Sequence, residues 1–237
     1  MDFVVSSTDK NFMVPVGGAV VASPVAAKVE WVSKMYPGRA SMAPILDLFI
    51  TFLSMGASGY TALLKERLRL LPLLIERVGE VAARHGERVL VSPYNTISVG
   101  VTLSALGAQL EAPDKDLSFL GSMLFQRCVS GTRVIPQGGT KTVGPHTFEG
   151  WGASASAYPY PYLTAACAMG LTEKELDLFC TRLDKALGDF RKKRKLPVSA
   201  GVPVEAGASA EGKEGGEGVG GRRLFHAWNK ALATKRW

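Results

Sequence analysis

Cysteine and histidine are scarce in this sequence. Three cysteines, Cys128, Cys167 and Cys180, and three histidines are spread over 237 residues. The cysteine number is odd, the spacing is wide, and no two cysteines form a CxxC pair. This usage excludes a disulfide framework and indicates a reducing compartment. We therefore expect no metal site, and we expect each cysteine to be a small buried hydrophobic residue rather than a nucleophile.

Long apolar runs and a secretory signal are also missing. The N-terminus is polar and carries both charges within its first ten residues, which is not the pattern of a signal peptide. The most apolar stretch, Ala43 to Gly56, is interrupted by Asp47 and is shorter than the roughly 20 residues that a membrane helix needs. We therefore expect a cytoplasmic protein with no membrane partner, in which this stretch forms a buried helix.

The basic excess is confined to the last fifth of the chain. Eleven of the 28 basic side chains but only four of the 21 acidic ones lie in residues 191–237, so this segment carries the entire formal net charge of +7. Such a block is typical of a surface that binds a polyanion such as RNA, and equally of a solubilising tail. Residues 197–221 hold eight glycines and no aromatic side chain, which predicts a flexible linker before a basic tail.

The spacing of apolar residues predicts helices and strands in alternation. The expected helices span 24–35, 42–55, 60–84, 116–125, 162–169 and 172–195, and the expected strands lie within 2–22, 88–106 and 132–136. Pro72 should kink or split its helix. Thr172 and Glu175 have the spacing of a capping box. This order of elements indicates an α/β layer protein.

The run from Asp9 to Gly18, Asp-Lys-Asn-Phe-Met-Val-Pro-Val-Gly-Gly, is the most informative stretch of the chain. It places a single lysine, Lys10, just before a short apolar strand that ends in a double glycine, and small hydroxyl side chains precede it. An amine held at a strand edge near hydroxyl groups suits a lysine that forms an imine with an aldehyde cofactor. An exposed lysine at the start of a hairpin is the simpler interpretation of the pattern alone.

This run and several later segments resemble one protein family. The later segments are Lys34-Met35-Tyr36-Pro37-Gly38-Arg39-Ala40-Ser41, Leu64-Lys65-Glu66-Arg67, Leu120-Gly121-Ser122-Met123-Leu124-Phe125, Val129-Ser130-Gly131, Asp177-Leu178-Phe179 and Arg182-Leu183-Asp184. The family is O-phosphoseryl-tRNA(Sec) selenium transferase, the selenocysteine synthase of archaea and eukaryotes. The resemblance is to its C-terminal portion and runs continuously from residue 2 to residue 195.

The resemblance implies an α/β fold, the C-terminal part of a fold-type I pyridoxal-phosphate-dependent transferase. Residues 1–45 would end the large cofactor domain. Residues 46–196 would form a helical linker and the small C-terminal α/β domain, and residues 197–237 a Gly-rich linker and basic tail. The family's cofactor lysine lies well past the middle of the full protein, whereas here it is residue 10. We therefore expect a piece that lacks the N-terminal half and is inactive alone.

The resemblance also implies roles for four residues. Lys10 would form the imine with pyridoxal 5′-phosphate and move the proton at the substrate's α-carbon. Arg39 would bind the substrate, and Arg127 and Lys192 would contact tRNA. From the residues alone, Arg39 could instead be solvated or cap a helix, and Arg127 could pair with a neighbouring helix. The run Arg191–Lys195 could compensate a helix dipole.

The reaction that the resemblance implies converts O-phosphoseryl-tRNA(Sec) to selenocysteinyl-tRNA(Sec), with selenophosphate as the selenium donor, in a homotetramer. Two other functions stay open. The chain could be a catalytically inert tRNA-binding or assembly module. It could also belong to a neighbouring group with the same cofactor fold, such as a phosphoseryl-tRNA sulfur transferase or a lyase, because nothing in these residues chooses selenium over sulfur.

Overall fold

The computed structural model describes residues 2–36, 38–90, 92, 94–111, 113–153 and 157–197, the side chains of residues 113–115 excepted. Its helices are α1 (Thr8–Phe12), α2 (Ala26–Met35), α3 (Ala43–Arg84), α4 (Ser104–Gly107), α5 (Pro113–Gln126) and α6 (Glu173–Arg194). Its strands are β1 (Val4–Ser7), β2 (Ala19–Ala22), β3 (Val89–Leu90), β4 (Ser98–Thr102), β5 (Thr132–Ile135), β6 (Thr140–Val143), β7 (His146–Glu149) and β8 (Tyr162–Ala166). The predicted linker and basic tail, from residue 198 on, lie outside the described residues.

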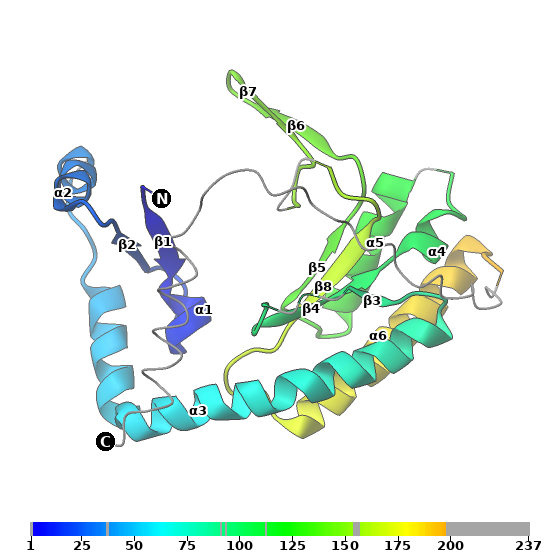
Figure 1. The fold of residues 1–237 in the computed structure, drawn as a ribbon, viewed down its shortest axis with the longest axis horizontal. Helices are drawn as coiled ribbons and strands as arrows, with labels where there is room; N and C mark the ends of the chain where they lie inside the picture. The colour runs from blue at the N-terminus through cyan, green and yellow to red at the C-terminus, as the bar shows by residue number, and fades with distance from the viewer. Residues whose placement is uncertain are drawn as a thin grey trace. The chain divides into compact units, whose positions relative to one another are not determined.

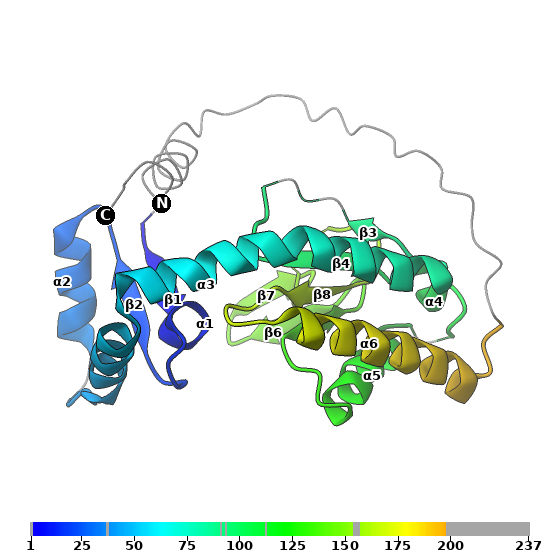
Figure 2. The ribbon, with the colours of Figure 1, turned by 90° about the horizontal axis from the view of Figure 1, so that it is seen from below.

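A four-stranded antiparallel sheet in the order β3-β4-β8-β5 organises most of the fold (Figure 1). The second half of α3 packs on β3 and β4, α5 packs on β5, and α6 lies against both α3 and α5. Figure 2 shows α3 and α6 running side by side. Strands β1 and β2 form a separate antiparallel pair near the N-terminus. This mixture of packed helices and strands confirms the predicted α/β architecture.

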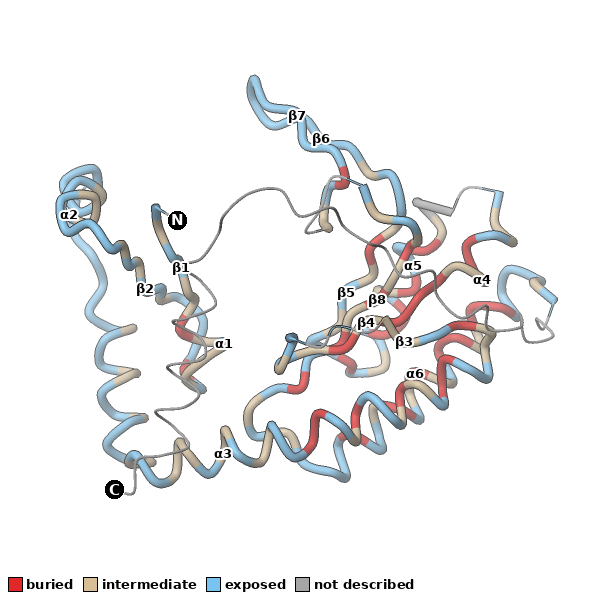
Figure 3. The backbone as a smooth tube through the Cα atoms, in the orientation of Figure 1, coloured by how far each residue is buried: buried red, intermediate tan, exposed pale blue. Residues whose placement is uncertain are grey.

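The hydrophobic core lies between the sheet, α5, α6 and the second half of α3 (Figure 3). Buried positions recur at helical spacing on the helices and alternate on the strands, as the geometry of each element requires. The main buried side chains are Leu70, Leu71, Leu74, Val78 and Val81 of α3, Val99 and Val101 of β4, Leu163 and Ala165 of β8, and Leu176, Leu183, Leu187 and Phe190 of α6. The core therefore joins residues that lie about 100 positions apart in the sequence.

Residues 162–169 are predicted to be a helix, and that prediction is wrong. Residues 162–166 form β8, which pairs with β4 on one side and with β5 on the other. Leu163, Ala165 and Cys167 are buried, and the residues between them are more exposed. This period of two is the signature of a strand. The alanines of the segment favour a helix locally, but the pairing of β8 with two neighbouring strands overrides that preference.

The hairpin of β6 and β7 is an element that the sequence analysis does not predict. All eight of its strand residues are exposed, so its strands lack the alternation of apolar and polar residues that would predict them from the sequence. It extends away from the main sheet (Figure 1). Near its base Phe148 and Trp151 meet edge to face, with ring centroids 5.7 Å apart. Lys141 lies over the Trp151 ring, 4.8 Å from its centroid.

The long helix α3 has one break, and it is at a glycine. Gly56 has φ 65° and ψ 174°, which confirms the predicted end of a helix at this residue. Pro72 does not split the helix, because Gly56 is the only residue with non-helical dihedral angles within α3, and a kink at Pro72 stays a prediction. The buried leucines on either side of Pro72 hold that part of the helix against the core, which offsets the hydrogen bond that a proline removes.

The first half of α3 is exposed, so the prediction that this apolar stretch is buried is wrong. Ile45, Phe49 and Leu53 each expose more than half of their surface. Among the described residues α3 is the one helix that could cross a membrane by length and composition alone, and none of its apolar window is buried. The break at Gly56 leaves a first straight segment, residues 43–55, that is shorter than the roughly 20 residues of a spanning helix.

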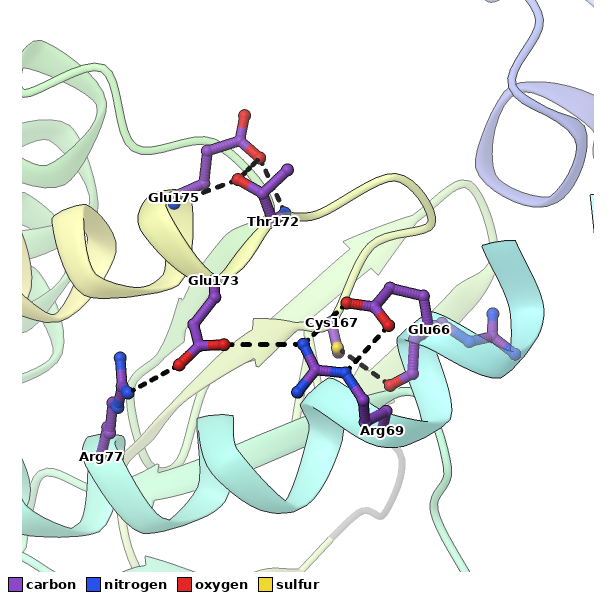
Figure 4. A network of polar contacts seen from close by, with 8 residues as sticks. Glu66, Arg69, Arg77, Cys167, Thr172, Glu173 and Glu175 are labelled. Carbon is purple, nitrogen blue, oxygen red and sulfur yellow. Dashed lines mark hydrogen bonds and ion pairs between the residues drawn. The ribbon is translucent and has the colours of Figure 1, made fainter. Parts of the chain in front are cut away.

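Polar contacts fix the start of α6 against α3 (Figure 4). The carboxylate of Glu173 accepts from Arg77 at 3.1 Å and lies 3.6 Å from Arg69. The predicted capping box is confirmed. The N–H of Glu175 donates to the Thr172 hydroxyl at 3.3 Å, and the N–H of Thr172 donates to the Glu175 carboxylate at 2.8 Å. These contacts set where the helix begins, and hence which face of α6 meets the core.

A buried carboxylate, Glu87, ties the end of α3 to β4. It is 5% exposed and accepts hydrogen bonds from the Thr102 hydroxyl at 2.7 Å and from the Leu106 N–H at 2.9 Å. Burial raises the pKa of Glu87, although these hydrogen bonds and the nearby Arg191 guanidinium oppose the shift. Arg191 is equally buried and donates to the His85 carbonyl at 2.6 Å. The two charges therefore sit in the same part of the interior.

Replacing Glu87 with glutamine should change how stability depends on pH. The folded-state pKa lies above the ordinary value of 4.5. The carboxyl therefore contributes stability that is fully present below the unfolded pKa and is lost as the pH rises through the folded pKa. Glutamine carries no charge, so the variant should gain stability relative to the native chain as the pH rises. Urea unfolding at several pH values between about 4 and 7 measures this. A difference that stays constant over that range contradicts it.

Leu163→Ala should strongly destabilise the chain, because Leu163 is 1% exposed at the centre of β8. Deleting a buried leucine side chain removes its transfer free energy and leaves a cavity, at a cost of about 2–5 kcal/mol. Leu53→Ala is the matched control, since Leu53 is 69% exposed. Urea unfolding followed by circular dichroism should separate the two variants. Equal stability would mean that residues 162–166 are not a central strand.

Candidate functional site

Lys10 lies on the short helix α1 rather than at the edge of a strand, so this part of the prediction is corrected. A strand precedes it as β1, but the short apolar strand expected to end at Gly17-Gly18 is absent, and β2 begins only after the double glycine. Between them the chain turns through α1, which ends at Met13 in the left-handed conformation with φ 55°. The Lys10 side chain is exposed and makes no hydrogen bond or ion pair with any other described residue. Its amine is therefore unpaired within the described part of the chain.

An aromatic cluster holds α1 against the bend of α3. Phe12, at the end of α1, meets Phe52 edge to face with ring centroids 5.6 Å apart, and stacks on Tyr60 at 6.4 Å. Phe52 and Tyr60 are themselves 5.8 Å apart. The Tyr60 hydroxyl donates to the carbonyl of Asn11 at 3.1 Å. Lys10 therefore stands on a helix whose next two residues are anchored by α3.

Gly18 allows the chain to pass close to the start of α1. Its carbonyl accepts from the N–H of Thr8 at 3.0 Å. A Cβ atom at Gly18 would lie only 2.7 Å from the Pro44 Cβ and 2.7 Å from the Thr8 hydroxyl oxygen. That hydroxyl is buried and has no hydrogen-bond partner in the described part of the chain. The Thr8 hydroxyl lies two residues from Lys10, so a polar group of a ligand bound beside Lys10 would supply the hydrogen bond that this hydroxyl lacks.

Arg39 lies in the segment between α2 and α3. Its side chain is exposed, and within the described residues it forms no ion pair and caps neither helix. No described contact joins it to Lys10. The guanidinium is therefore available to an anion, and its predicted role in substrate binding stays a prediction.

Arg127 is held by α6. Its guanidinium donates to the Asp189 carboxylate at 2.7 Å and to the Met123 carbonyl at 2.9 Å, and the side chain is partly buried. The ion pair with a neighbouring helix, considered above as the alternative, is thus present. Arg127 also lines an open groove of about 670 Å³, together with Gln126, Cys128, Thr181, Arg182 and Lys185. Its contact with tRNA stays a prediction.

The basic run from Arg191 to Lys195 is not a uniform surface. Arg191 is buried, Arg194 pairs with an aspartate of α5 at 2.7 Å, and Lys193 lies over an aromatic ring. Lys192 is exposed and makes no ion pair with any described residue. Arg191 is therefore not available at the surface of the run, while the predicted role of Lys192 in tRNA binding stays a prediction.

The cysteines are free, and two of the three behave as predicted. Cys167 and Cys180 are buried, and burial raises the pKa of both thiols, which makes them poor nucleophiles. Cys128 is exposed, so the expectation of burial is wrong for it. Within the described residues, no three side chains of histidine, cysteine, aspartate or glutamate are grouped so that they could hold a metal ion.

Sequence reasoning misses the residues that position the candidate groups. Tyr60 lies 49 residues from Asn11, and Asp189 lies 62 residues from Arg127. Contacts over such distances leave no local pattern in a single sequence. The one available signal is Tyr60 itself, an aromatic residue with a hydroxyl at the start of a mainly aliphatic helical stretch.

Comparison with known proteins identifies the family of this chain. A family model described as O-phosphoseryl-tRNA(Sec) selenium transferase, SepSecS, matches residues 1–188. The chain belongs to this family. The resemblance identified from the motifs is thereby confirmed, and residues 1–188 include Lys10, Arg39 and Arg127. Lys192 lies just beyond the matched range.

Relatives of the chain carry the family name. It is 40% identical over 205 residues to the O-phosphoseryl-tRNA(Sec) selenium transferase of Dictyostelium discoideum, covering 81% of this chain and 42% of the relative. The protein of the same name from Caenorhabditis elegans is 34% identical over 222 residues, covering 86% and 44%. The one from Methanopyrus kandleri is 31% identical over 191 residues, covering 79% and 39%. The chain thus spans about two fifths of the length of these relatives.

A solved structure shares the fold. The crystal structure of an archaeal O-phosphoseryl-tRNA(Sec) selenium transferase superposes with a TM-score of 0.60 at 26% sequence identity. The superposition covers 78% of this chain and 38% of that one. The architecture described above is therefore that of a part of this family's fold.

Gly18→Ala should loosen α1. A methyl group would overlap Pro44 and the Thr8 hydroxyl, and overpacking of this kind costs about 1–3 kcal/mol. Hydrogen exchange at the Thr8 amide, which donates to the Gly18 carbonyl, should become faster.

Gly188→Ala provides the control, because a Cβ at this position in α6 meets nothing within 4 Å. Alanine is favoured over glycine inside a helix by about 0.5–1 kcal/mol, so this variant should be slightly more stable in urea unfolding. An unchanged rate of hydrogen exchange at the Thr8 amide of Gly18→Ala would show that the close approach of Gly18 to Thr8 and Pro44 does not hold α1 in place.

Proposed function

We propose that this chain is the part of a pyridoxal-phosphate-dependent selenium transferase that carries the cofactor lysine and the C-terminal α/β domain of a fold-type I enzyme. The whole protein would convert O-phosphoseryl-tRNA(Sec) to selenocysteinyl-tRNA(Sec) with selenophosphate, in the cytoplasm and as a homotetramer. The observation that carries this proposal is the free amine of Lys10 on the anchored helix α1, within the stretch that matches the family.

The residues around Lys10 fit the requirements of an aldehyde cofactor. An imine needs an amine that is not engaged in an ion pair, and Lys10 meets that condition among the described residues. The buried hydroxyl of Thr8 has no partner, and Ser6 and Ser7 add hydroxyl groups on the adjoining strand. Pyridoxal phosphate, when bound, supplies an electron sink for the charge that develops at the substrate's α-carbon.

Lys10 would hold the cofactor and then move the proton at the α-carbon of the phosphoseryl group. The anchoring of α1 by Phe12 and Asn11 would keep the Lys10 amine in one place between holding the cofactor and moving the proton. Arg39, whose guanidinium forms no ion pair with a described residue, would bind a phosphate or carboxylate of the substrate through two parallel hydrogen bonds. Arg127 and Lys192 would hold the tRNA through its bases and backbone.

The relatives contain sequence that this chain does not match, and the corresponding sequence would supply the other parts of the site. The curated relatives are more than twice as long as the stretch they share with this chain. We propose that the group facing the pyridine nitrogen and the loop that holds the substrate phosphate lie there. The exposed apolar half of α3 would then be covered by the same protein or by a neighbouring subunit.

Lysine trapping tests the proposal directly. Incubation with pyridoxal phosphate, reduction with borohydride and peptide mapping should give one dominant adduct at Lys10, because its amine is free and its helix is anchored. Lys10→Ala should abolish that adduct and the imine absorbance.

Lys65→Ala is the matched control, since Lys65 is also exposed and makes no described ion pair. It should leave the adduct at Lys10 intact. Adducts spread evenly over the exposed lysines, or an absorbance that persists in Lys10→Ala, would remove the support for Lys10 as the cofactor lysine.

A further inference from the structure

The side chain of Arg67, on α3, has no partner within the described part of the chain. Its Nε atom is buried, and its guanidinium forms no hydrogen bond or ion pair with any described residue. Arg191 also has an unpartnered Nε, but its two other nitrogens donate to carbonyl oxygens. A partly buried guanidinium without an acceptor is unfavourable, because it gives up hydrogen bonds to water without replacing them. Arg67 therefore lacks an acceptor that a bound group would supply.

The carboxylates closest to Arg67 along α3 and at the start of α6 are engaged with other cations (Figure 4). Glu66 accepts from Arg69 at 2.8 and 2.9 Å. Glu173 accepts from Arg77 at 3.1 Å and lies 3.6 Å from Arg69. Neither carboxylate pairs with Arg67, so the positive charge of this side chain is left without an anion among the described residues.

Arg67 lies on the side of α3 that carries Tyr60. The two residues are seven positions apart, which places them within about 20° of each other around the helix axis and about 10 Å apart along it. Burial raises the pKa of Tyr60, and the charge of Arg67 opposes that shift, so the guanidinium acts on the hydroxyl. This hydroxyl donates to the carbonyl of Asn11, the residue after Lys10. The unpaired cation thus belongs to the same corner of the fold as the candidate lysine.

The loop between β8 and α6 closes this corner from another side. The thiol of Cys167, directly after β8, donates to the backbone carbonyl of Arg67 at 3.6 Å. Burial raises the pKa of this thiol, and the charge of Arg67 opposes that shift as well. A Cβ atom at Gly170 would lie 3.2 Å from the Cε of Met13, the residue that ends α1. Arg67 therefore lies where α1, α3 and this loop meet, and partial exclusion of water there strengthens its attraction for an anion.

We propose that Arg67 binds a phosphate monoester at this corner, as a binding residue in addition to Lys10 and Arg39. A guanidinium offers two parallel N–H donors that match two oxygens of one phosphate. The choice of phosphate rests on the proposed function, in which both the cofactor and the phosphoseryl substrate carry a phosphate monoester. The two sources share the same chemistry, and separate measurements distinguish them.

Stabilisation by inorganic phosphate tests Arg67 without involving Lys10. The native chain and Arg67→Gln are unfolded in urea at increasing phosphate concentration and constant ionic strength. The difference between their urea midpoints should grow with phosphate, because a ligand that binds only the folded chain stabilises it, whereas general salt effects act on both. Arg67→Lys keeps the charge without the planar fork and should retain part of the response. Without phosphate, Arg67→Gln should be at least as stable as the native chain, since it removes an unpaired cation.

Lys65→Gln is the matched control for charge. It removes one cation from the same helix, two residues from Arg67 and therefore on the opposite side of α3. Lys65 is exposed and makes no described ion pair. This variant should keep the phosphate response of the native chain.

Trapping at Lys10 identifies the source of the phosphate. Pyridoxal phosphate is compared with pyridoxal, which lacks the phosphate, in the borohydride experiment. If the cofactor supplies the phosphate, Arg67→Gln should raise the half-saturating concentration of pyridoxal phosphate about tenfold and leave that of pyridoxal unchanged. If the substrate supplies it, O-phosphoserine but not serine should raise the urea midpoint of the native chain, and this rise should be absent in Arg67→Gln.

Equal phosphate responses in the native chain and Arg67→Gln would overturn the inference, as would the absence of a response in the native chain. A loss of stability in Arg67→Gln without phosphate would also overturn it, since Arg67 would then bond within the fold. An equal response to acetate would assign the site to a carboxylate instead, and a response lost in Lys65→Gln would reduce it to net charge. A response specific to Arg67 without any adduct at Lys10 would support the inference while the proposed function fails.

Discussion

Burial of the second half of α3 against the sheet and α6 is the interaction on which the rest of the structure depends. The leucines and valines of this half lie at helical spacing and meet alternate residues of β4 and β8. Their burial fixes the direction of α3. The helix then carries Tyr60 and Phe52 to α1, and it carries Arg69 and Arg77 to the start of α6. The candidate lysine and the candidate RNA-binding helix are therefore positioned by the same apolar face.

Buried charge adds specificity to this core. Glu87 follows α3 and Arg191 lies in the last turn of α6, and both are nearly inaccessible to solvent. Removing two charged groups from water is unfavourable unless hydrogen bonds compensate for it. Here a hydroxyl, a backbone N–H and a carbonyl do so in part, since the Nε of Arg191 has no partner among the described residues. An apolar pair could give equal stability. A charged pair with directional partners instead favours one register of α6 against the end of α3.

The sequence predicts the four longer helices because their signals are local, whereas the short helices α1 and α4 fall in stretches predicted to be strands. The capping box at Thr172, the glycine at position 56 and the apolar spacing of α3 each act within a few residues, and each is confirmed. The failures are at elements decided by distant partners. β8 is a strand because two other strands flank it, and the exposed hairpin of β6 and β7 has no apolar pattern.

The candidate site shows the same difference between local signals and contacts with distant residues. Lys10 is evident from its surrounding run, and the family match covers it. Its helical backbone, the anchoring by Tyr60 and the pairing of Arg127 with Asp189 all depend on residues about 50 or more positions away. Residue type therefore points to the candidate groups, and the fold determines what holds them.

The aromatic cluster couples the position of the lysine to the bend of a helix. Phe52 and Tyr60 lie on opposite sides of the break at Gly56, and the ring of Phe12 contacts both. A change in the angle between the two halves of α3 must therefore shift Phe12 and, with it, the short helix that bears Lys10. A subunit that docks on the exposed half of α3 and changes this angle would therefore change the orientation of the Lys10 amine without contacting it.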